Sequence, residues 1–372
     1  MATIIFKPTE KCNSNCLYCD VVRKQRTVTT MSIETLELVF IRINEYLLVK
    51  NEEKMSLIWH GGEPLLLGCE YFNNALEFQN RHCPTTKSRI EHAIQSNLTL
   101  FSEEYIDIFR NLGIDQVGSS FDPASNVRGL GQNIDSDKYN RMYMKGDSIL
   151  SDCGFGSGII YVVTKKSLTN PLRTFFFLTN LKLRGGVSIN PVLIYDEKHM
   201  DIAITPDEYV EFLGAIFPTW WGYSDRYPQV EPFRSLTKNI KDRQQHLGCA
   251  DSGMCAYSHV NIAPDGEVSH CGRSSDWGIL PYGKIYDRTL IEVFADKQRK
   301  LLLKRNEVLL EEECKGCRFW TICHGGCPLD SYSEHKNFMH KTKWCVAKKG
   351  FIEKYFEPIT GLRFEPYAES VK

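Results

Sequence analysis

The chain has 372 residues, of which 42% are hydrophobic, so it is long enough to bury a large core in one or two domains. Its 45 lysines and arginines nearly balance 46 aspartates and glutamates, and the sequence has no basic tract, which argues against a general nucleic-acid-binding protein. No stretch has the apolar length of a membrane span, and the N-terminus does not resemble a signal peptide. We therefore expect a soluble, cytoplasmic protein that binds neither nucleic acid nor membrane.

Short apolar runs alternate with amphipathic runs over the first two thirds of the chain. Six strands are expected at 3–8, 54–62, 89–97, 116–122, 156–164 and 187–194. Six helices are expected at 32–48, 70–82, 102–112, 139–150, 172–183 and 205–217. Six strand–helix repeats predict an α/β fold in which a parallel sheet curves into a partial (β/α)6 TIM-like barrel. Ligands of such folds bind at the carboxyl ends of the strands.

The fourteen cysteines are distributed unevenly. Three of them, Cys12, Cys16 and Cys19, lie in the loop "EKCNSNCLYCD" that follows the first expected strand. Eight more crowd the last third: Cys249, Cys255, Cys271, Cys314, Cys317, Cys323, Cys327 and Cys345. Because reducing compartments keep thiols free, metal ligation is the leading explanation of this excess. The isolated Cys69, Cys83 and Cys153 are expected to be unligated.

The three-cysteine loop is better suited to iron–sulfur chemistry than to zinc. Structural zinc sites usually close with four protein ligands, and a catalytic zinc site with three thiolates would be unusual. A four-iron cluster has four corners, so three cysteines leave one iron open for another ligand. Chance packing, or zinc bound with a distant fourth cysteine, is the alternative.

The spacing Cys12-x3-Cys16-x2-Cys19 resembles the signature of the radical S-adenosylmethionine (SAM) enzymes. The resemblance implies that SAM chelates the open iron through its amino and carboxylate groups. It also implies that an electron from the cluster cleaves SAM to a 5′-deoxyadenosyl radical, which abstracts a hydrogen atom from the substrate. Tyr18 matches an aromatic position that in the family lies against the adenine.

Polar residues at the ends of the next expected strands fit the same resemblance. The stretch "GGEP", Gly61, Gly62, Glu63 and Pro64, resembles the motif that binds the SAM amine, with Glu63 accepting from the ammonium. Further contacts to SAM or substrate are expected from Gln95, Asn97, Ser119 and Ser120. For His60, a packed or backbone-bonded role is expected rather than a substrate contact.

The cysteine-rich last third resembles the SPASM extension of radical SAM enzymes, most specifically in "CKGCRFWTICHGGC". Carried over residue by residue, a first auxiliary [4Fe-4S] cluster uses Cys249, Cys255, Cys271 and Cys327. A second uses Cys314, Cys317, Cys323 and Cys345. The expected cofactors are therefore three [4Fe-4S] clusters and S-adenosyl-L-methionine. Two structural zinc sites, in a protein without catalysis, are the alternative.

The expected domains are a radical SAM partial barrel at 1–235, a SPASM iron–sulfur domain at 236–348 and a C-terminal tail at 349–372. Length and layout resemble the anaerobic sulfatase-maturating enzymes, in which an aspartate follows the third SPASM cysteine and acts as the base. Here Gly272 and Arg273 follow Cys271, which weakens that interpretation.

The stretches "WHGGEPLLLG" and "CGR" resemble more closely the SPASM enzymes that mature ribosomally synthesised peptides (RiPPs). We therefore expect an oxidoreductase that forms a crosslink, such as a cyclophane, ether or thioether, in a precursor peptide, with flavodoxin or ferredoxin as electron donor. Formylglycine generation in a sulfatase and peptide epimerisation remain alternatives. We expect no domain that binds a leader peptide before the first strand. The catalytic base is not identified, and Arg273, Asp122 and Tyr257 are weak candidates.

Overall fold

The computed structural model describes residues 1–19, 21, 27–123, 126–181, 183–194, 197–227, 229–243 and 245–366. The chain divides into two compact units, each discontinuous in sequence. The first unit comprises Met1–Ile159 and Ala256–Lys300, and the second comprises Ile160–Cys255 and Leu301–Lys372. The linear domain boundaries after residues 235 and 348 stay predictions.

The first unit is built on a sheet whose central strands are parallel, as expected. Its strands are β1 (Ala2–Thr9), β2 (Met55–Gly61), β3 (Ile90–Gln95), β4 (Gln116–Ser120), β8 (His259–Ile262), β9 (Glu267–Ser269) and β10 (Pro281–Lys284). They lie in the order β10-β9-β8-β1-β2-β3-β4, and β5 (Gly156–Val163) begins in this unit and ends in the second. Pairing is parallel from β8 through β1, β2 and β3 to β4, and antiparallel at β9 and β10. The carboxyl ends of β1 to β4 therefore share one edge of the sheet.

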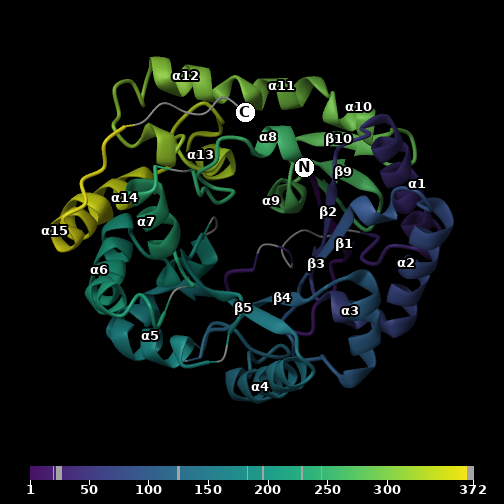
Figure 1. Cartoon of the computed structure of the whole chain (residues 1–372), viewed down its shortest axis with the longest axis horizontal. Coiled ribbons are helices and arrows are strands. Elements are labelled where there is room, and N and C mark those ends of the chain that lie inside the picture. Colours follow the sequence, from purple (N-terminus) through teal and green to yellow (C-terminus); the bar gives the residue numbers. More distant parts are fainter. Residues whose placement is uncertain are drawn as a thin grey trace. The chain divides into compact units, whose positions relative to one another are not determined.

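Helices α1 (Ile33–Val49), α2 (Gly68–His82) and α3 (Ile106–Leu112) lie along the outer side of β1 to β4 (Figure 1). The core beneath them is aromatic. The ring of Trp59 lies 5.0 Å from that of Phe6 and 4.8 Å from that of Phe72, measured between centroids. The buried indole N–H donates to Nδ1 of His92 at 3.1 Å, so this polar group is satisfied. The other helices confined to this unit are α4 (Ser136–Asp152), α9 (Gly272–Trp277) and α10 (Leu290–Phe294), while α8 (Cys255–Ser258) and α11 (Lys297–Leu303) cross its boundaries.

Helix α9 is fixed to β1 by a buried ion pair. The ammonium of Lys7 hydrogen-bonds to both carboxylate oxygens of Asp276 at 2.8 Å and to the carbonyl oxygen of Gly272 at 3.0 Å. The two side chains are 1% and 5% exposed, so water screens the pair little. Because Gly272 directly follows Cys271, this pair fixes the start of α9 and the cysteine in front of it.

The second unit contains β6 (Gly186–Pro191) and β7 (Val230–Glu231), which pair in parallel. Its helices are α5 (Pro171–Thr179), α6 (Pro206–Gly222), α7 (Phe233–Lys241), α12 (Arg305–Glu311), α13 (Pro328–His335), α14 (Cys345–Phe351) and α15 (Glu357–Thr360). The predicted capping box at the start of α6 is confirmed, since Thr205 and Glu208 exchange side-chain and backbone hydrogen bonds at 3.1 and 3.0 Å. Helix α5 ends at Thr179, four residues before the expected 183.

Helix α14 packs against α6 through aromatic side chains. The rings of Phe217 and Phe351 meet edge to face at 5.3 Å, and Gly214 gives room for the ring of Tyr355. This contact anchors α14, which begins at Cys345. None of the helices in the described residues is both long and apolar enough to cross a membrane.

The Lys7–Asp276 pair predicts a stability effect. Lys7→Met leaves a buried carboxylate without its counter-charge, which should cost about 3–5 kcal/mol and lower the thermal unfolding midpoint. The double variant Lys7→Met/Asp276→Leu should recover much of this loss, because neither charge is then buried alone. Lys54→Met is the matched control, since Lys54 pairs with Glu91 in solvent. Equal midpoints for Lys7→Met and the control would contradict the prediction.

Candidate functional site

The three-cysteine loop leaves the carboxyl end of β1 and is held by the segment that follows β4. The amide of Asn15 donates to the carbonyl oxygen of Gly129 at 2.9 Å, and that of Leu17 donates to Val127 at 2.8 Å. Within the loop, the amide of Cys19 donates to the carbonyl oxygen of Cys16 at 3.1 Å, which closes a tight turn. The loop conformation is therefore fixed by hydrogen bonds between backbone groups.

The three thiols lie close enough to influence one another electrostatically. Burial raises the pKa of Cys12 to about 12 and that of Cys16 to about 11, and in both cases the charge of Cys19 adds to the effect. The Cys12 sulfur accepts from the amide of Ser14 at 3.4 Å. A thiolate in such surroundings needs a cation, and iron supplies that charge when it binds. The donor set thus fits three ligands of one [4Fe-4S] cluster.

The loops after β1 and β2 touch because two glycines allow it. A Cβ at Gly61, whose φ is +120°, would lie 2.1 Å from the carbonyl oxygen of Thr9, and one at Gly62 would lie 2.1 Å from that of Lys11. The amide of Gly62 donates to Thr9 and the amide of Glu63 donates to Lys11, both at 2.9 Å. Glycine is therefore required at both positions to bring Glu63 beside the cysteine loop.

The carboxylate of Glu63 is 1% exposed and receives three hydrogen bonds. Its Oε1 accepts from the amide of Leu65 at 3.0 Å and the hydroxyl of Ser96 at 2.8 Å, and its Oε2 accepts from the amide of Asn97 at 2.7 Å. Burial raises the pKa of Glu63 to about 7 in spite of these donors. Pro64 opens the short helix η1 (Pro64–Leu67) that orients the motif. A carboxylate has about four acceptor sites, so one remains for a further donor.

Asn97 connects the end of β3 to the cysteine loop. Its side-chain nitrogen donates to Asn13 Oδ1 at 2.8 Å and to Ser14 Oγ at 3.2 Å. The same nitrogen lies 3.9 Å from the sulfur of Cys12. Asn97 thus supports the cysteine loop directly, whereas Gln95 donates to Ser120 Oγ at 3.4 Å.

Ser119 and Ser120 face opposite sides of β4. The hydroxyl of Ser119 is buried against Tyr143 at 3.0 Å and donates to the carbonyl oxygen of Gly158 at 2.9 Å. Ser120 is half-buried on the same side as Gln95. Of the two serines, only Ser120 is placed where it could meet a ligand of the strand ends, and a SAM contact by either stays a prediction.

Tyr18 and Asp122 belong to a buried charged network centred on Arg128. The guanidinium donates to Asp122 Oδ2 at 2.8 Å and to the Tyr18 hydroxyl at 2.5 Å, and that hydroxyl in turn donates to Asp122. Asp122 is 2% exposed and Arg128 is 8% exposed. Asp122 is therefore engaged as the counter-ion of Arg128, an arrangement that favours a supporting role over that of a free base.

The other candidate residues lie on helices α8 and α9 or at the end of β2. Arg273 lies on α9 with its guanidinium 5.9 Å from the centre of the Trp277 ring. Tyr257 is 55% exposed on α8. The expected backbone-bonded role of His60 is confirmed, since its Nδ1 accepts from the amide of Gly61 at 2.7 Å. Burial lowers the pKa of His60 to about 4, so the ring is neutral.

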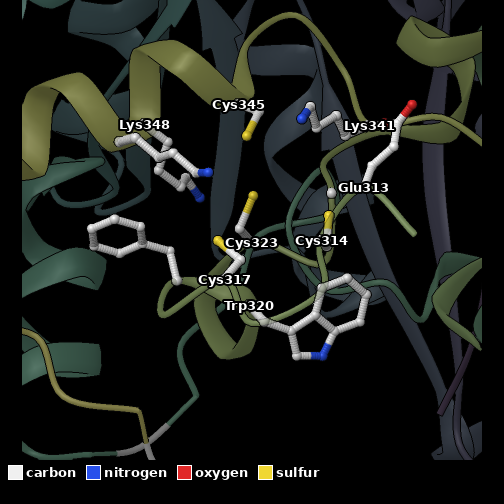
Figure 2. A pocket seen from close by; sticks show the side chains of 11 residues that line it. Glu313, Cys314, Cys317, Trp320, Cys323, Lys341, Cys345 and Lys348 are labelled. Carbon is white, nitrogen blue, oxygen red and sulfur yellow. The ribbon is translucent and has the colours of Figure 1, made fainter. Parts of the chain in front are cut away.

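The second unit places the four cysteines of the predicted second auxiliary site around one pocket (Figure 2). Cys314 and Cys317 lie in the turn after α12, Cys323 ends the short helix η6 (Trp320–Ile322), and Cys345 begins α14. The amide of Cys317 donates to the carbonyl oxygen of Cys314 at 3.0 Å. A hydrogen bond from the Cys323 thiol lowers the pKa of Cys345. Four thiols directed at one space fit the ligand set of a cluster.

The predicted first auxiliary set is divided between the units. Cys249, Cys255 and Cys327 lie in the second unit, whereas Cys271 precedes α9 in the first. Its grouping therefore stays a prediction. Among the described residues, no group of three or more His, Cys, Asp or Glu side chains is spaced to hold a single metal ion.

Arg305 is a further buried charge in the cysteine-rich part of the second unit. It donates to four backbone carbonyl oxygens: Phe338 at 2.6 Å, His324 at 3.0 Å, Gly325 at 3.1 Å and His340 at 2.7 Å. Its charge also interacts with Cys327 and Cys255. Like Arg128, Lys7 and Asp276, it was missed by sequence reasoning, because a single charged residue outside a motif carries no signal of its partner.

Comparison with known proteins agrees with this geometry. The radical SAM superfamily model matches residues 6–169, and the SPASM model, described as an iron–sulfur cluster-binding domain, matches residues 249–318. A cysteine-type anaerobic sulfatase-maturating enzyme of Clostridium perfringens is 24% identical over 369 residues, covering 95% of this chain and 96% of its own. A serine-type anaerobic sulfatase-maturating enzyme of Bacteroides thetaiotaomicron is 25% identical over 353 residues, covering 87% and 81%.

Solved structures show the same fold. Native anSMEcpe with bound AdoMet superposes with a TM-score of 0.81 at 22% identity, covering 96% of this chain and 98% of its own. Streptococcus suis SuiB bound to S-adenosylmethionine gives a TM-score of 0.60 at 16% identity, covering 92% and 76%. Together with the cysteine loop and the motif around Glu63, these matches identify the chain as a radical SAM enzyme with a C-terminal SPASM iron–sulfur domain.

Proposed function

We propose that this enzyme oxidises a side chain of a ribosomally synthesised peptide, forming a crosslink within it. The observation that carries the proposal is the site at the ends of β1, β2 and β3. There, the thiols of the cysteine loop and the buried carboxylate of Glu63 lie at the carboxyl ends of the strands, the edge at which ligands of such folds bind. The cofactors in this proposal are SAM and three [4Fe-4S] clusters, held by the cysteines named above.

When bound, the first cluster and SAM supply a 5′-deoxyadenosyl radical that abstracts a hydrogen atom from the substrate. Cys12, Cys16 and Cys19 hold the cluster, and Glu63 accepts a hydrogen bond from the SAM ammonium. Asn97 and Arg128 keep the loop in place through their bonds to Asn13, Ser14 and Tyr18. Their role is to fix the geometry before SAM arrives.

Oxidation requires the substrate to lose one more electron and one proton as the new bond forms. If the eight SPASM cysteines hold two fully ligated clusters, these would have no open corner for a substrate and would supply an electron acceptor. We propose that an external carrier such as flavodoxin or ferredoxin exchanges electrons with the enzyme. The proton acceptor is not assigned.

Peptide substrates are supported by the relatives. Structures of anSMEcpe contain bound peptides, and SuiB has been solved with its precursor peptide SuiA. Crosslinking is favoured over formylglycine formation by the residues after Cys271. The first carboxylate that follows it is Asp276, and both of its oxygens are occupied by Lys7.

Formylglycine generation in a sulfatase is the second candidate. It is favoured by the sulfatase-maturating enzymes, whose similarity extends over nearly the whole chain. Another base could serve in formylglycine formation, so the ion pair of Asp276 does not exclude that reaction. The identity of the product distinguishes the two candidate functions.

Glu63→Gln should weaken SAM binding by about 10- to 100-fold, because it removes a charged acceptor worth about 1.5–3 kcal/mol. The measurement is equilibrium binding of SAM to the anaerobically reconstituted protein. Glu70→Gln, at an exposed position on α2, is the matched control and should bind normally. Both variants should keep about twelve irons per chain, the content of three four-iron clusters. Unchanged affinity in Glu63→Gln at full iron content would remove the assigned role.

The reaction is tested by high-resolution mass spectrometry of a precursor peptide encoded beside the gene, after anaerobic incubation with enzyme, SAM and reductant. Loss of two hydrogens, with fragment ions missing between two residues, is the expected result. Unchanged mass with deuterium taken up from solvent would indicate epimerisation and contradict the proposal. Conversion of a sulfatase-derived cysteine or serine peptide to an aldehyde would establish the second candidate instead.

A further inference from the structure

The pocket formed by Cys314, Cys317, Cys323 and Cys345 is lined by more positively than negatively charged side chains. Three lysines line it, Lys341, Lys348 and Lys349, against a single carboxylate, Glu313. Figure 2 shows the nitrogen ends of Lys341 and Lys348 directed toward the cysteine sulfurs. The surroundings of this site are therefore cationic.

The three lysines differ in how far their charge is compensated. Lys348 forms an ion pair with Asp251 and donates to the carbonyl oxygen of Ile322 at 3.1 Å. Lys341 interacts with Glu313, but that carboxylate also bonds to the ring of His340 at 2.7 Å. The charge of Lys348 is thus largely balanced, and that of Lys341 is balanced in part.

Lys349 also lines the pocket. Burial acts to lower the pKa of Lys349, yet the charges of Cys345, Cys317 and Cys314 raise it, so the ammonium lies within electrostatic reach of these sulfurs. No carboxylate among the described residues forms an ion pair with Lys349. The charges of Lys341 and Lys349 also act to lower the pKa of Cys345, so both lie within electrostatic reach of the ligand set.

We propose that Lys341 and Lys349 raise the reduction potential of the cluster held by Cys314, Cys317, Cys323 and Cys345. The inference rests on the cluster ligation proposed above, but not on the identity of the peptide. Reduction of a [4Fe-4S] cluster adds one electron, taking the core from the 2+ to the 1+ state. Nearby positive charge, and hydrogen bonds to the ligand sulfurs, stabilise the more negative reduced state. In the proposed oxidation, this cluster would therefore be the favoured acceptor of the electron removed from the substrate.

The test is a redox titration with dithionite as reductant, followed by electron paramagnetic resonance. The titration is made in the Cys12→Ala/Cys16→Ala/Cys19→Ala variant, which lacks the ligands of the first cluster, so that only the signals of the auxiliary clusters remain. The signal of this site is the one lost on Cys317→Ser. Lys349→Gln and Lys341→Gln should each shift its midpoint to a more negative potential, and the double variant should shift it further. The other auxiliary signal should stay in place.

Two sets of control variants separate local charge from other effects. Lys343→Gln removes a lysine from the same segment that does not line the pocket, is 50% exposed and pairs with Glu334 at 3.5 Å, so it should leave the midpoint unchanged. Lys341→Arg and Lys349→Arg keep the charge and should stay near the wild-type midpoint. If the glutamine variants lose iron, salt dependence replaces them: raising the KCl concentration should lower the midpoint of this signal more than that of the other.

An unchanged midpoint in the double variant at full iron content would overturn this inference alone. An equal shift of the midpoint potential in Lys343→Gln would also overturn it, and so would an arginine variant whose midpoint shifts as far as that of its glutamine counterpart. In the salt experiment, the contradicting result is an equal response of the two signals. If the wild-type protein binds no second auxiliary cluster, the ligand assignment is overturned as well. This outcome differs from a bound cluster whose midpoint potential does not respond to the lysine substitutions.

Discussion

The geometry of the N-terminal site depends on one buried carboxylate. Glu63 leaves the end of β2 and accepts hydrogen bonds from Ser96 and Asn97 at the end of β3. The amide of Glu63 bonds to the loop after β1 at Lys11. Glu63 therefore links the ends of three strands. Burying its carboxylate costs free energy unless the acceptor sites of the two oxygens are hydrogen-bonded. Three are used within the chain, and a cationic ligand would use the remaining one.

The two cysteine sites that are complete within one unit differ in their surroundings. At the N-terminal site the charge of Glu63 acts to raise the pKa of Cys12, whereas the charge of Arg128 acts to lower that of Cys16. The four-cysteine pocket is lined instead by three lysines, Lys341, Lys348 and Lys349. Negative surroundings favour the oxidised state of a cluster and positive surroundings favour the reduced state. The lysines that line the four-cysteine pocket therefore underlie our proposal for the cluster at that site.

Sequence patterns predicted much of this architecture. The parallel strands β1 to β4 and the capping box of α6 followed from hydrophobic periodicity and from capping residues, because these signals are local. The cysteine spacing and "GGEP" predicted the site for the same reason, since a short loop must place its ligands by sequence distance alone.

Long-range pairs could not be predicted in this way. Lys7 and Asp276 are separated by 269 positions, and neither belongs to a motif. The network of Arg128 with Tyr18 and Asp122 is also formed by tertiary packing. Asp122 was considered a weak candidate for the catalytic base because it ends a strand, but its ion pair with Arg128 depends on a loop whose fold the sequence does not reveal.

The proposed mechanism requires Cys12, Cys16 and Cys19 to hold the cluster that cleaves SAM. The most direct measurement is 5′-deoxyadenosine released from SAM by the anaerobically reconstituted protein under dithionite. Wild-type protein should release it, and the variant in which all three cysteines are alanine should release none while keeping the absorbance of the auxiliary clusters. Undiminished release by the triple variant would contradict the assignment of this loop as the radical-generating site.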